Sequence, residues 1–192
     1  MRLVLDWDGT CTVSDSLVDA VQAFGDPSVY ERRFASIDDS LEAEVGTIRA
    51  TAGEAAAWAV EHVRLRPGFH RLVERFPPMI VSSGLRQLID PVLGREGVEV
   101  DLQCNDADPR PDGWRLRFRD DSRCPVCDDR FKRSALPDDG PLVYAGDGIS
   151  DRCAARAADR IFARGWLAEN LERSGIRYEP FESLDDIAAA LS

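Results

Sequence analysis

Three short apolar segments, far apart in the chain, each end in a side chain that can bind an ion or a phosphate group. They are residues 2–6 ending at Asp6, residues 78–82 ending at Ser82, and residues 141–147 ending at Asp147. Short apolar strands that alternate with helical stretches predict a parallel sheet with helices on both faces. Ligands of such sheets bind at the carboxyl ends of the strands, so we expect the three side chains in one crevice.

The rest of the pattern predicts a Rossmann-like α/β core with an inserted helical cap. The block over 13–65 is too long for an ordinary crossover between strands, so we assign it to the cap and assign 1–12 and 66–192 to the core. Alternation around Trp114 predicts a hairpin within 106–121, and Ser150 is the expected N-cap of its helix. Periodicity and breakers predict helices over 15–24, 40–50, 53–63, 69–76, 85–93, 130–136, 150–158, 167–174 and 184–191, and further strands over 98–104 and 161–163.

Composition limits the classes of partner. The chain has 192 residues and a net charge of −11, which disfavours nucleic acid and anionic lipid. No apolar run approaches the roughly 18 residues of a membrane span, and Asp6 comes too early for a signal peptide. We therefore expect a soluble, cytoplasmic protein whose partners include neither nucleic acid nor a membrane. The oligomeric state does not follow from the sequence.

The first chemical motif is Asp6-Trp7-Asp8-Gly9-Thr10, directly after an apolar strand. Alternate residues of a strand point to opposite faces, but a turn beginning at Gly9 can bring Asp8 back over the crevice. Asp6 can then hold a metal with one oxygen and attack phosphorus with the other. Asp8 can protonate the leaving oxygen and later deprotonate the attacking water. An Asp-x-Asp pair alone also fits a solvated strand end.

The second motif is Gly146-Asp147-Gly148, followed by Asp151, after another strand. The two acids are four residues apart, which suits one face of a helix start. Together with Asp6 they make a hard, oxygen-rich donor set that matches Mg²⁺. The alternative is an acidic capping cluster that holds no ion.

Two further signals concern phosphate. Ser82-Ser83-Gly84 offers a hydroxyl and backbone N–H groups at a helix start, where anions bind, although such turns are often only structural. Lys132 is the single lysine among 24 basic residues. Its compact charge can offset the charge of the nucleophile and of phosphoryl oxygens, whereas its ordinary role would be a surface ion pair.

Taken in order, these motifs resemble those of the haloacid-dehalogenase-like phosphatases. Asp6-x-Asp8-Gly9-Thr10 matches motif one of that family, Ser82 motif two, Lys132 motif three, and Gly146-Asp147-x-x-x-Asp151 motif four. The resemblance implies that Asp6 is the phosphorylated nucleophile and Asp8 the acid and base. It implies metal ligands from Asp6, Asp147, Asp151 and, through its main-chain carbonyl, Asp8. It also implies phosphate contacts from Thr10, Ser82, Ser83, Gly84 and Lys132.

Other residues resemble one branch of the family more closely. Asp15 follows the nucleophile by nine residues, where phosphoserine phosphatases place a glutamate of the cap. Gln103-Cys104-Asn105, the cysteines before Lys132 and residues 162–167 are similar to the methionine-salvage phosphatases. That resemblance implies hydrolysis of 2-hydroxy-3-keto-5-methylthiopentenyl-1-phosphate. A phosphoserine phosphatase, a phosphotransferase or mutase, and a non-enzymatic phosphate-sensing protein of the same fold are the alternatives.

The cysteines leave a separate question open. There are five, and Cys124-Pro125-Val126-Cys127 has the spacing of half a zinc site. Cys104 could add a third ligand across the predicted hairpin. The pair could equally be two ordinary thiols or have a redox role. An odd count with one close pair argues against a secreted disulfide framework.

Overall fold

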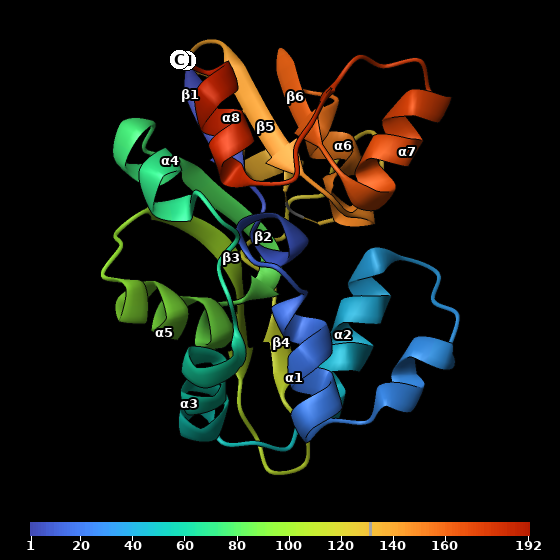
Figure 1. Ribbon diagram of the computed structural model, residues 1–192. Helices are drawn as coiled ribbons and strands as arrows, with labels where there is room; N and C mark the ends of the chain where they lie inside the picture. The colour runs from blue at the N-terminus through green and yellow to red at the C-terminus, as the bar shows by residue number, and fades with distance from the viewer. Residues whose placement is uncertain (131) are drawn as a thin grey trace.

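The structure, a computed structural model, describes residues 1–130 and 132–192. Its centre is a seven-stranded sheet in the order β4-β3-β2-β1-β5-β6-β7 (Figure 1). All neighbouring strands run parallel except β3 and β4, which form the predicted antiparallel hairpin. The strands are β1 (Arg2–Leu5), β2 (Met79–Leu85), β3 (Asp101–Asp108), β4 (Arg115–Arg117), β5 (Leu142–Gly146), β6 (Arg160–Ala163) and β7 (Glu179–Pro180). The predicted α/β fold is confirmed.

Helices cover both faces of this sheet. The chain alternates strand and helix after residue 66, so each parallel connection returns across a face of the sheet. The helices are α1 (Ser16–Phe24), α2 (Ile37–Thr47), α3 (Ala52–His62), α4 (Phe69–Arg75), α5 (Arg86–Glu96), α6 (Arg152–Ala155), α7 (Gly165–Arg173) and α8 (Leu184–Ala190).

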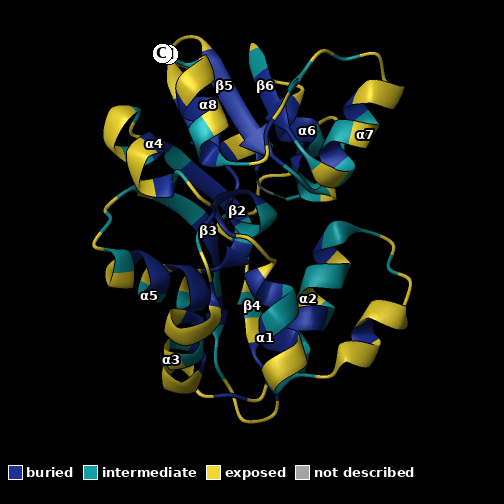
Figure 2. Ribbon diagram, viewed as in Figure 1, coloured by how far each residue is buried: buried dark blue, intermediate teal, exposed yellow. Residues whose placement is uncertain are grey.

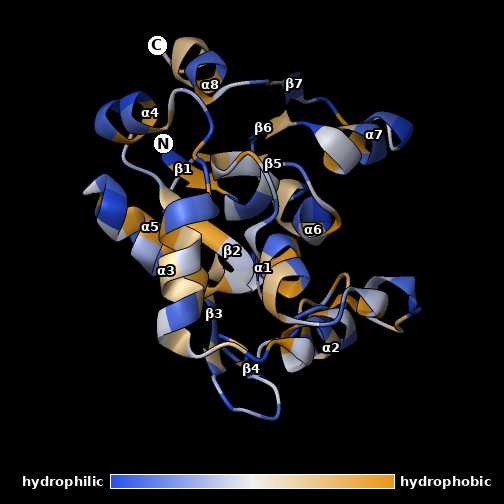
Figure 3. Cartoon of the chain, turned by 60° about the horizontal axis from the view of Figure 1, so that its bottom comes forward, coloured by the Kyte–Doolittle hydropathy of each residue, from blue (hydrophilic) through white to orange (hydrophobic). Residues whose placement is uncertain are grey.

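Alternation along β1 divides the apolar core in two. Leu3 and Leu5 belong to one buried cluster, whereas Val4 between them belongs to the other, because successive side chains of a strand point to opposite faces. Figure 2 shows the central strands buried along their length, and Figure 3 shows apolar residues gathered around β1 and β2. β1 is therefore fixed from both sides, which gives Asp6 at its end a rigid base.

The helical insertion begins and ends at one point of the core. Thr12 and Leu65 form an antiparallel bridge, and the Val13 N–H donates to the carbonyl of Arg64 at 2.9 Å. Within the insertion, α3 packs on α5 and α2 packs on β4. The division into a cap over 13–65 and a core over the remainder stays a prediction.

Some local predictions were wrong or incomplete. Ser150 is not an N-cap, since it lies inside a 3-10 turn (Ile149–Asp151) that precedes a shorter helix than expected. The helix predicted over 130–136 is only a 3-10 turn (Arg133–Ala135), and residue 131 lies outside the described residues. A 3-10 turn (Pro27–Glu31) and β7 were not predicted. Among the described residues, no helix has both the length and the apolar character to cross a membrane.

Candidate active site

A tight turn after β1 shapes the centre of the site. Residues Trp7–Cys11 form an irregular helical turn in which Gly9 has φ +73°. A Cβ at Gly9 would lie 2.2 Å from Asp147 Oδ2, so only glycine fits both the backbone conformation and the space. The predicted turn at Gly9 is therefore present, and it brings Asp8 into the same crevice as Asp6.

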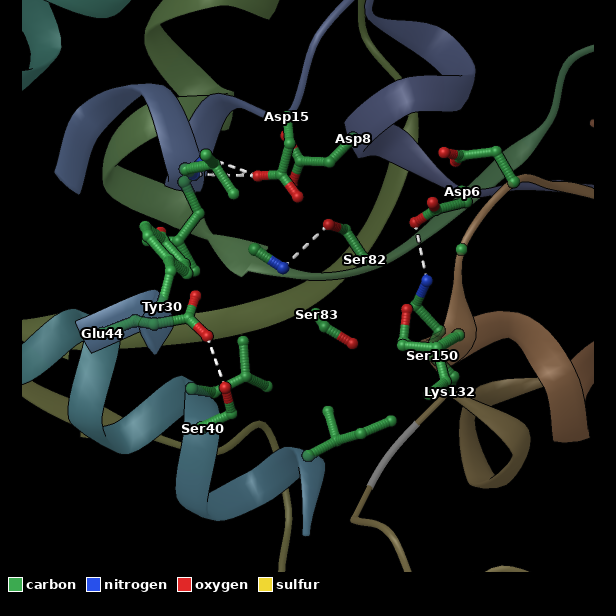
Figure 4. Close-up of a pocket in the computed structure, with 18 residues that line it drawn as sticks. Asp6, Asp8, Asp15, Tyr30, Ser40, Glu44, Ser82, Ser83, Lys132 and Ser150 are labelled. Atoms are coloured by element: carbon green, nitrogen blue, oxygen red, sulfur yellow. Dashed lines mark hydrogen bonds and ion pairs between the residues drawn. The ribbon is translucent and has the colours of Figure 1, made fainter. Parts of the chain in front are cut away.

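Lys132 joins two of the acids at the bottom of this crevice. Its Nζ donates to Asp6 Oδ1 at 2.7 Å (Figure 4). It also donates to Asp151 Oδ1 at 2.6 Å, and all three residues are buried. Burial by itself disfavours a charged amine, but Asp151 and Asp6 more than offset it and raise the pKa of Lys132. The lysine is therefore a fixed positive charge beside Asp6 Oδ1.

Three carboxylates gather around this lysine. One oxygen each from Asp6, Asp147 and Asp151 lies within 4.8 Å of the other two. Burial first, and then the like charge of Asp151, raise the pKa of Asp6, while Lys132 lowers it. A divalent cation would favour the ionised forms, and the donors are the hard oxygens that Mg²⁺ prefers. The residues present therefore fit the predicted magnesium site.

Neighbouring groups hold the two acids of motif four in different ways. Thr10 Oγ1 donates to Asp147 Oδ1 at 2.9 Å. Asp151 Oδ1 accepts from the Tyr144 hydroxyl at 2.5 Å in addition to Lys132, and its Oδ2 accepts the N–H groups of Asp147 and Gly148. Both oxygens of Asp151 are thus engaged, which makes it a positioning residue for the lysine and the Asp147 loop. Asp147 and Asp6 are better placed to bind an ion directly.

Asp8 lies on the opposite side of the crevice from Lys132. Its Oδ1 accepts the Ser16 N–H at 2.7 Å and the Ser16 hydroxyl at 2.5 Å. Burial, followed by the charge of Asp15, raises the pKa of Asp8 to about 8, even though the bonds from Ser16 lower it. A Cβ at Gly84 would lie 2.7 Å from Asp8 Oδ2, so that glycine gives the carboxyl its space. Near neutral pH, Asp8 is mostly in the protonated form that a general acid needs.

These groups open into a cavity of about 270 Å³ between the core and the helical insertion (Figure 4). Asp6, Asp8, Lys132 and Asp147 line its floor, and Ser82, Ser83 and Gly84 line one side. Residues of the insertion cover it, and they include acidic, aromatic and aliphatic side chains: Asp15, Leu17, Val18, Tyr30, Ile37, Ser40, Leu41 and Glu44. The structure therefore brings nearly all the predicted site residues to one place.

Two of the predicted residues contact different groups from those expected. Thr10 is fully buried and does not line the cavity, because its hydroxyl faces Asp147. The Ser82 hydroxyl lines the cavity but also accepts the N–H of Gly84 at 2.9 Å, within a strand that continues to Leu85. α5 begins only at Arg86, so the predicted seat at Ser82-Ser83-Gly84 is an irregular strand end.

Several residues that shape the site were not predicted from the sequence. Arg66 is buried and its guanidinium donates to the carbonyls of Gly9, Thr10 and Thr12, which holds the motif-one turn. Ser16 as the partner of Asp8 was also missed. A pattern of residue types does not indicate such contacts, since they depend on how segments distant in sequence meet. The covering residues Tyr30 and Glu44, which share a hydrogen bond, were missed for the same reason.

Comparison with known proteins shows which enzymes this chain is similar to. No protein-family model matches the chain. A curated protein of Bacillus cereus (strain B4264), named 2-hydroxy-3-keto-5-methylthiopentenyl-1-phosphate phosphatase, is 24% identical over 209 residues, which cover 100% of this chain and 95% of that protein. The chain is similar over its whole length to phosphatases of the haloacid-dehalogenase-like kind. The resemblance predicted from the sequence is confirmed at this level.

Solved structures agree on the fold of this haloacid-dehalogenase-like chain. A phosphoserine phosphohydrolase-like protein from Francisella tularensis superposes with a TM-score of 0.70 at 18% identity, covering 100% of this chain and 99% of that one. A phosphoserine phosphatase described as a phospho-aspartyl intermediate analogue superposes with a TM-score of 0.67 at 16% identity, covering 98% of each chain. At these identities the structures establish the shared fold.

Proposed function

We propose that this phosphatase hydrolyses a small phosphorylated metabolite with Mg²⁺, through a phosphoaspartyl intermediate on Asp6. One arrangement carries the proposal. A buried carboxylate bonded to Lys132 lies beside Asp147, and Asp8 with its raised pKa shares the same cavity. A nucleophile, a fixed cation, a metal-binding acid and a proton donor are the groups that phosphoryl transfer requires.

Each step of the proposed reaction uses a specific oxygen or proton of Asp6 or Asp8. Lys132 occupies Asp6 Oδ1, so Oδ2 is the oxygen that bonds to phosphorus as the ester P–O bond breaks. Asp8 gives its proton to the leaving oxygen. A water oxygen then bonds to phosphorus, Asp8 takes the proton of that water, and the bond between Asp6 and phosphorus breaks. Mg²⁺, when bound, neutralises phosphate charge and aligns the phosphorus with the nucleophile.

We further propose that residues 13–65 act as a cap and select the substrate. Among the described residues that line the cavity, Lys132 alone carries a positive charge, and it is already paired with two carboxylates. A substrate with a second anionic group, such as the carboxylate of phosphoserine, would meet Asp15 and Glu44 without a cationic partner. Burying an unpaired negative charge is costly, so the cavity disfavours a tail that carries a carboxylate.

The aliphatic side chains of the cap suit one candidate. Leu17, Val18, Ile37 and Leu41 provide an apolar wall. 2-Hydroxy-3-keto-5-methylthiopentenyl-1-phosphate carries no charge beyond its phosphate and ends in an apolar thioether. We therefore propose it as the substrate. Phosphoserine is the second candidate, because Asp15 stands nine residues after Asp6.

Phosphate release tests both levels of the proposal. The wild type, Asp6→Asn and the control Asp138→Asn, whose carboxylate is exposed, are assayed with p-nitrophenyl phosphate, with and without Mg²⁺. We expect Mg²⁺-dependent release that is lost in Asp6→Asn and kept in the control. Undiminished release by Asp6→Asn would show that another group is the nucleophile.

A substrate panel then separates the two candidates. We expect kcat/KM for the thioether-containing phosphate to exceed that for phosphoserine by about 100-fold or more, since the cavity offers no partner for the second carboxylate. A preference for phosphoserine would reject the substrate assignment and leave the mechanism intact.

A further inference from the structure

A second cluster of metal-binding side chains lies outside the cavity. The sulfur atoms of Cys124, Cys127 and Cys153 all lie within 4.8 Å of one another. Cys104, the third ligand considered from the sequence, is not part of this group. Cys153 lies two residues after Asp151 of motif four, on a segment separate from the Cys-x-x-Cys sequence. The cluster therefore joins two segments of the molecule that lie 26 or more residues apart.

The sulfur separations suit a shared metal ion. Tetrahedral Zn²⁺ with Zn–S bonds of about 2.3 Å holds its sulfur atoms about 3.8 Å apart. The sulfur atoms of Cys124 and Cys153 are 3.3 Å apart. A disulfide would need about 2.05 Å between them. The observed distance is therefore nearer to that of two ligands of one ion than to that of a covalent bond.

Backbone N–H groups are directed at these sulfur atoms. The Val126 N–H donates to Cys124 Sγ at 3.4 Å, and the Cys127 N–H also approaches it. The Asp129 N–H approaches the sulfur of Cys127. Asp128 makes this possible by adopting a left-handed conformation with φ +61° directly after the second cysteine. Such donors stabilise negative charge on sulfur, which is the form that binds a metal.

The loop that carries this cluster is held by polar contacts, such as those of Arg130 with Asp38, and not by an apolar core. Among the described residues between 117 and 134, none belongs to either apolar core cluster, and Val126 at the tip is 70% exposed. Yet the same loop delivers Lys132 to Asp6 and Asp151 at hydrogen-bonding distance. Lys132 itself has φ +55°, which is unfavourable for a residue with a side chain. A short segment without an apolar core commonly needs a metal or a cross-link to hold its conformation.

We propose that Cys124, Cys127 and Cys153 bind one structural Zn²⁺, which clamps the Lys132 loop to the segment that carries Asp151. Cys127 is five residues before Lys132, and Cys153 is two residues after Asp151. The ion would therefore connect the two segments that carry Lys132 and Asp151. Thiolates select Zn²⁺ over Mg²⁺, so the two metals occupy different sites.

The surroundings balance the charge of such a centre. Three thiolates around Zn²⁺ leave one negative charge once the thiol protons pass to solvent. The Arg133 guanidinium lies 3.8 Å from Cys153 Sγ and offsets that charge. The Asp129 carboxylate, two residues after Cys127, pairs with Arg152 and is not part of the group of three sulfur atoms.

Metal content of the whole chain tests the site. Protein reduced and loaded with Zn²⁺, then freed of excess ion, is analysed by elemental mass spectrometry as wild type, Cys124→Ser, Cys153→Ser and Asp147→Asn. Cys104→Ser is the matched control, because Cys104 is equally buried but outside the cluster. We expect one Zn²⁺ per chain in the wild type, Cys104→Ser and Asp147→Asn, and loss of Zn²⁺ in the two cluster variants.

Cobalt substitution keeps the test valid if a variant fails to fold. Wild-type protein loaded with Co²⁺ should show an intense thiolate-to-cobalt charge-transfer band together with the visible bands of tetrahedral coordination. Three results would overturn the proposal. The first is a wild type that neither retains zinc nor shows a thiolate band. The second is zinc that is retained in both cluster variants but lost in Asp147→Asn. The third is a Cys124–Cys153 disulfide in the unreduced protein that blocks zinc binding.

Discussion

The carboxylate cluster at Asp6 and the thiol cluster at Cys153 share the short stretch of chain from Asp147 to Cys153 but suit different chemistry. Asp6, Asp147 and Asp151 present hard oxygens at the open end of the sheet, next to the cavity. Two of the thiols lie on the Lys132 loop, and the third, Cys153, lies in α6. The carboxylates of Asp6 and Asp147 line the cavity beside Lys132, whereas no thiol lines that cavity.

The difference shows how one ion pair can be held from two sides. Asp151 accepts four hydrogen bonds, from Lys132, Tyr144 and two backbone N–H groups, and has no exposed surface. The Lys132 loop is held by ion pairs nearer its surface, among them Arg130 with Asp38 and Arg152 with Asp129. A carboxylate cluster that binds the reacting group and a sulfur cluster that fixes the loop would divide these tasks.

Removal of a metal-binding acid should have the largest effect on activity and should distinguish the roles of the two clusters. We expect Asp147→Asn to lower kcat/KM by about 1,000-fold or more, because the ion that aligns the phosphate loses a ligand. Cys153→Ser, measured beside it at saturating Mg²⁺, should retain far more activity. Comparable losses in the two variants would mean that the thiol cluster takes part in the reaction.

Replacement of the lysine tests the link between the clusters. Lys132→Arg keeps the charge, but its planar, larger head cannot occupy a buried point contact with two carboxylates. We expect kcat to fall by about 100-fold, with the Mg²⁺ requirement unchanged. Arg133→Lys, next to it in sequence, should have a small effect. Full activity in Lys132→Arg would show that the position needs only a charge.

The thiol cluster should act on stability more than on rate. Stripping Zn²⁺ from the wild type with a chelator, followed by return of Mg²⁺ alone, should lower the melting temperature by several degrees, since about 1 kcal/mol corresponds to roughly 2–4 °C in a chain of this size. The same treatment of Cys124→Ser should change nothing further. Calorimetry measures both, and an equal drop in that variant would assign the effect to another ion.

The smallest predicted effect concerns the pH profile. The phosphorylation step needs protonated Asp8, whose pKa is about 8, so kcat/KM should fall as the pH rises through that value. Bonds from Ser16 favour the ionised form and lower this pKa. Ser16→Ala should therefore move the alkaline limb upward by about one pH unit. Ser14→Ala, which removes a hydroxyl bonded to Asp19, is the control. A shift of the alkaline limb to lower pH would contradict the assignment of Asp8 as the general acid.

The structure agrees with the prediction from sequence better in some parts of the molecule than in others. Strands β1, β2 and β5, the hairpin and most helices were predicted near their observed positions, because their patterns repeat over many residues. Short elements such as the 3-10 turn at Ile149–Asp151 were misjudged, since hydrogen bonds to Asp151 decide their conformation. Asp6 and Asp147 were predicted to meet because each follows a strand whose end is fixed by the sheet, and Lys132 was singled out as the only lysine.

By itself, the sequence determined the kind of chemistry available: the order of the acidic motifs, the single lysine and the closely spaced cysteines. These are properties of residue type and spacing along the chain. Only the tertiary structure decided that Thr10 supports Asp147, that Ser16 bonds to Asp8, that Arg66 holds the motif-one turn, and that Cys153 completes the thiol cluster. The physical reason is that a polar or metal-binding contact depends on distances of a few ångströms, and most of these partners meet only when distant segments pack together.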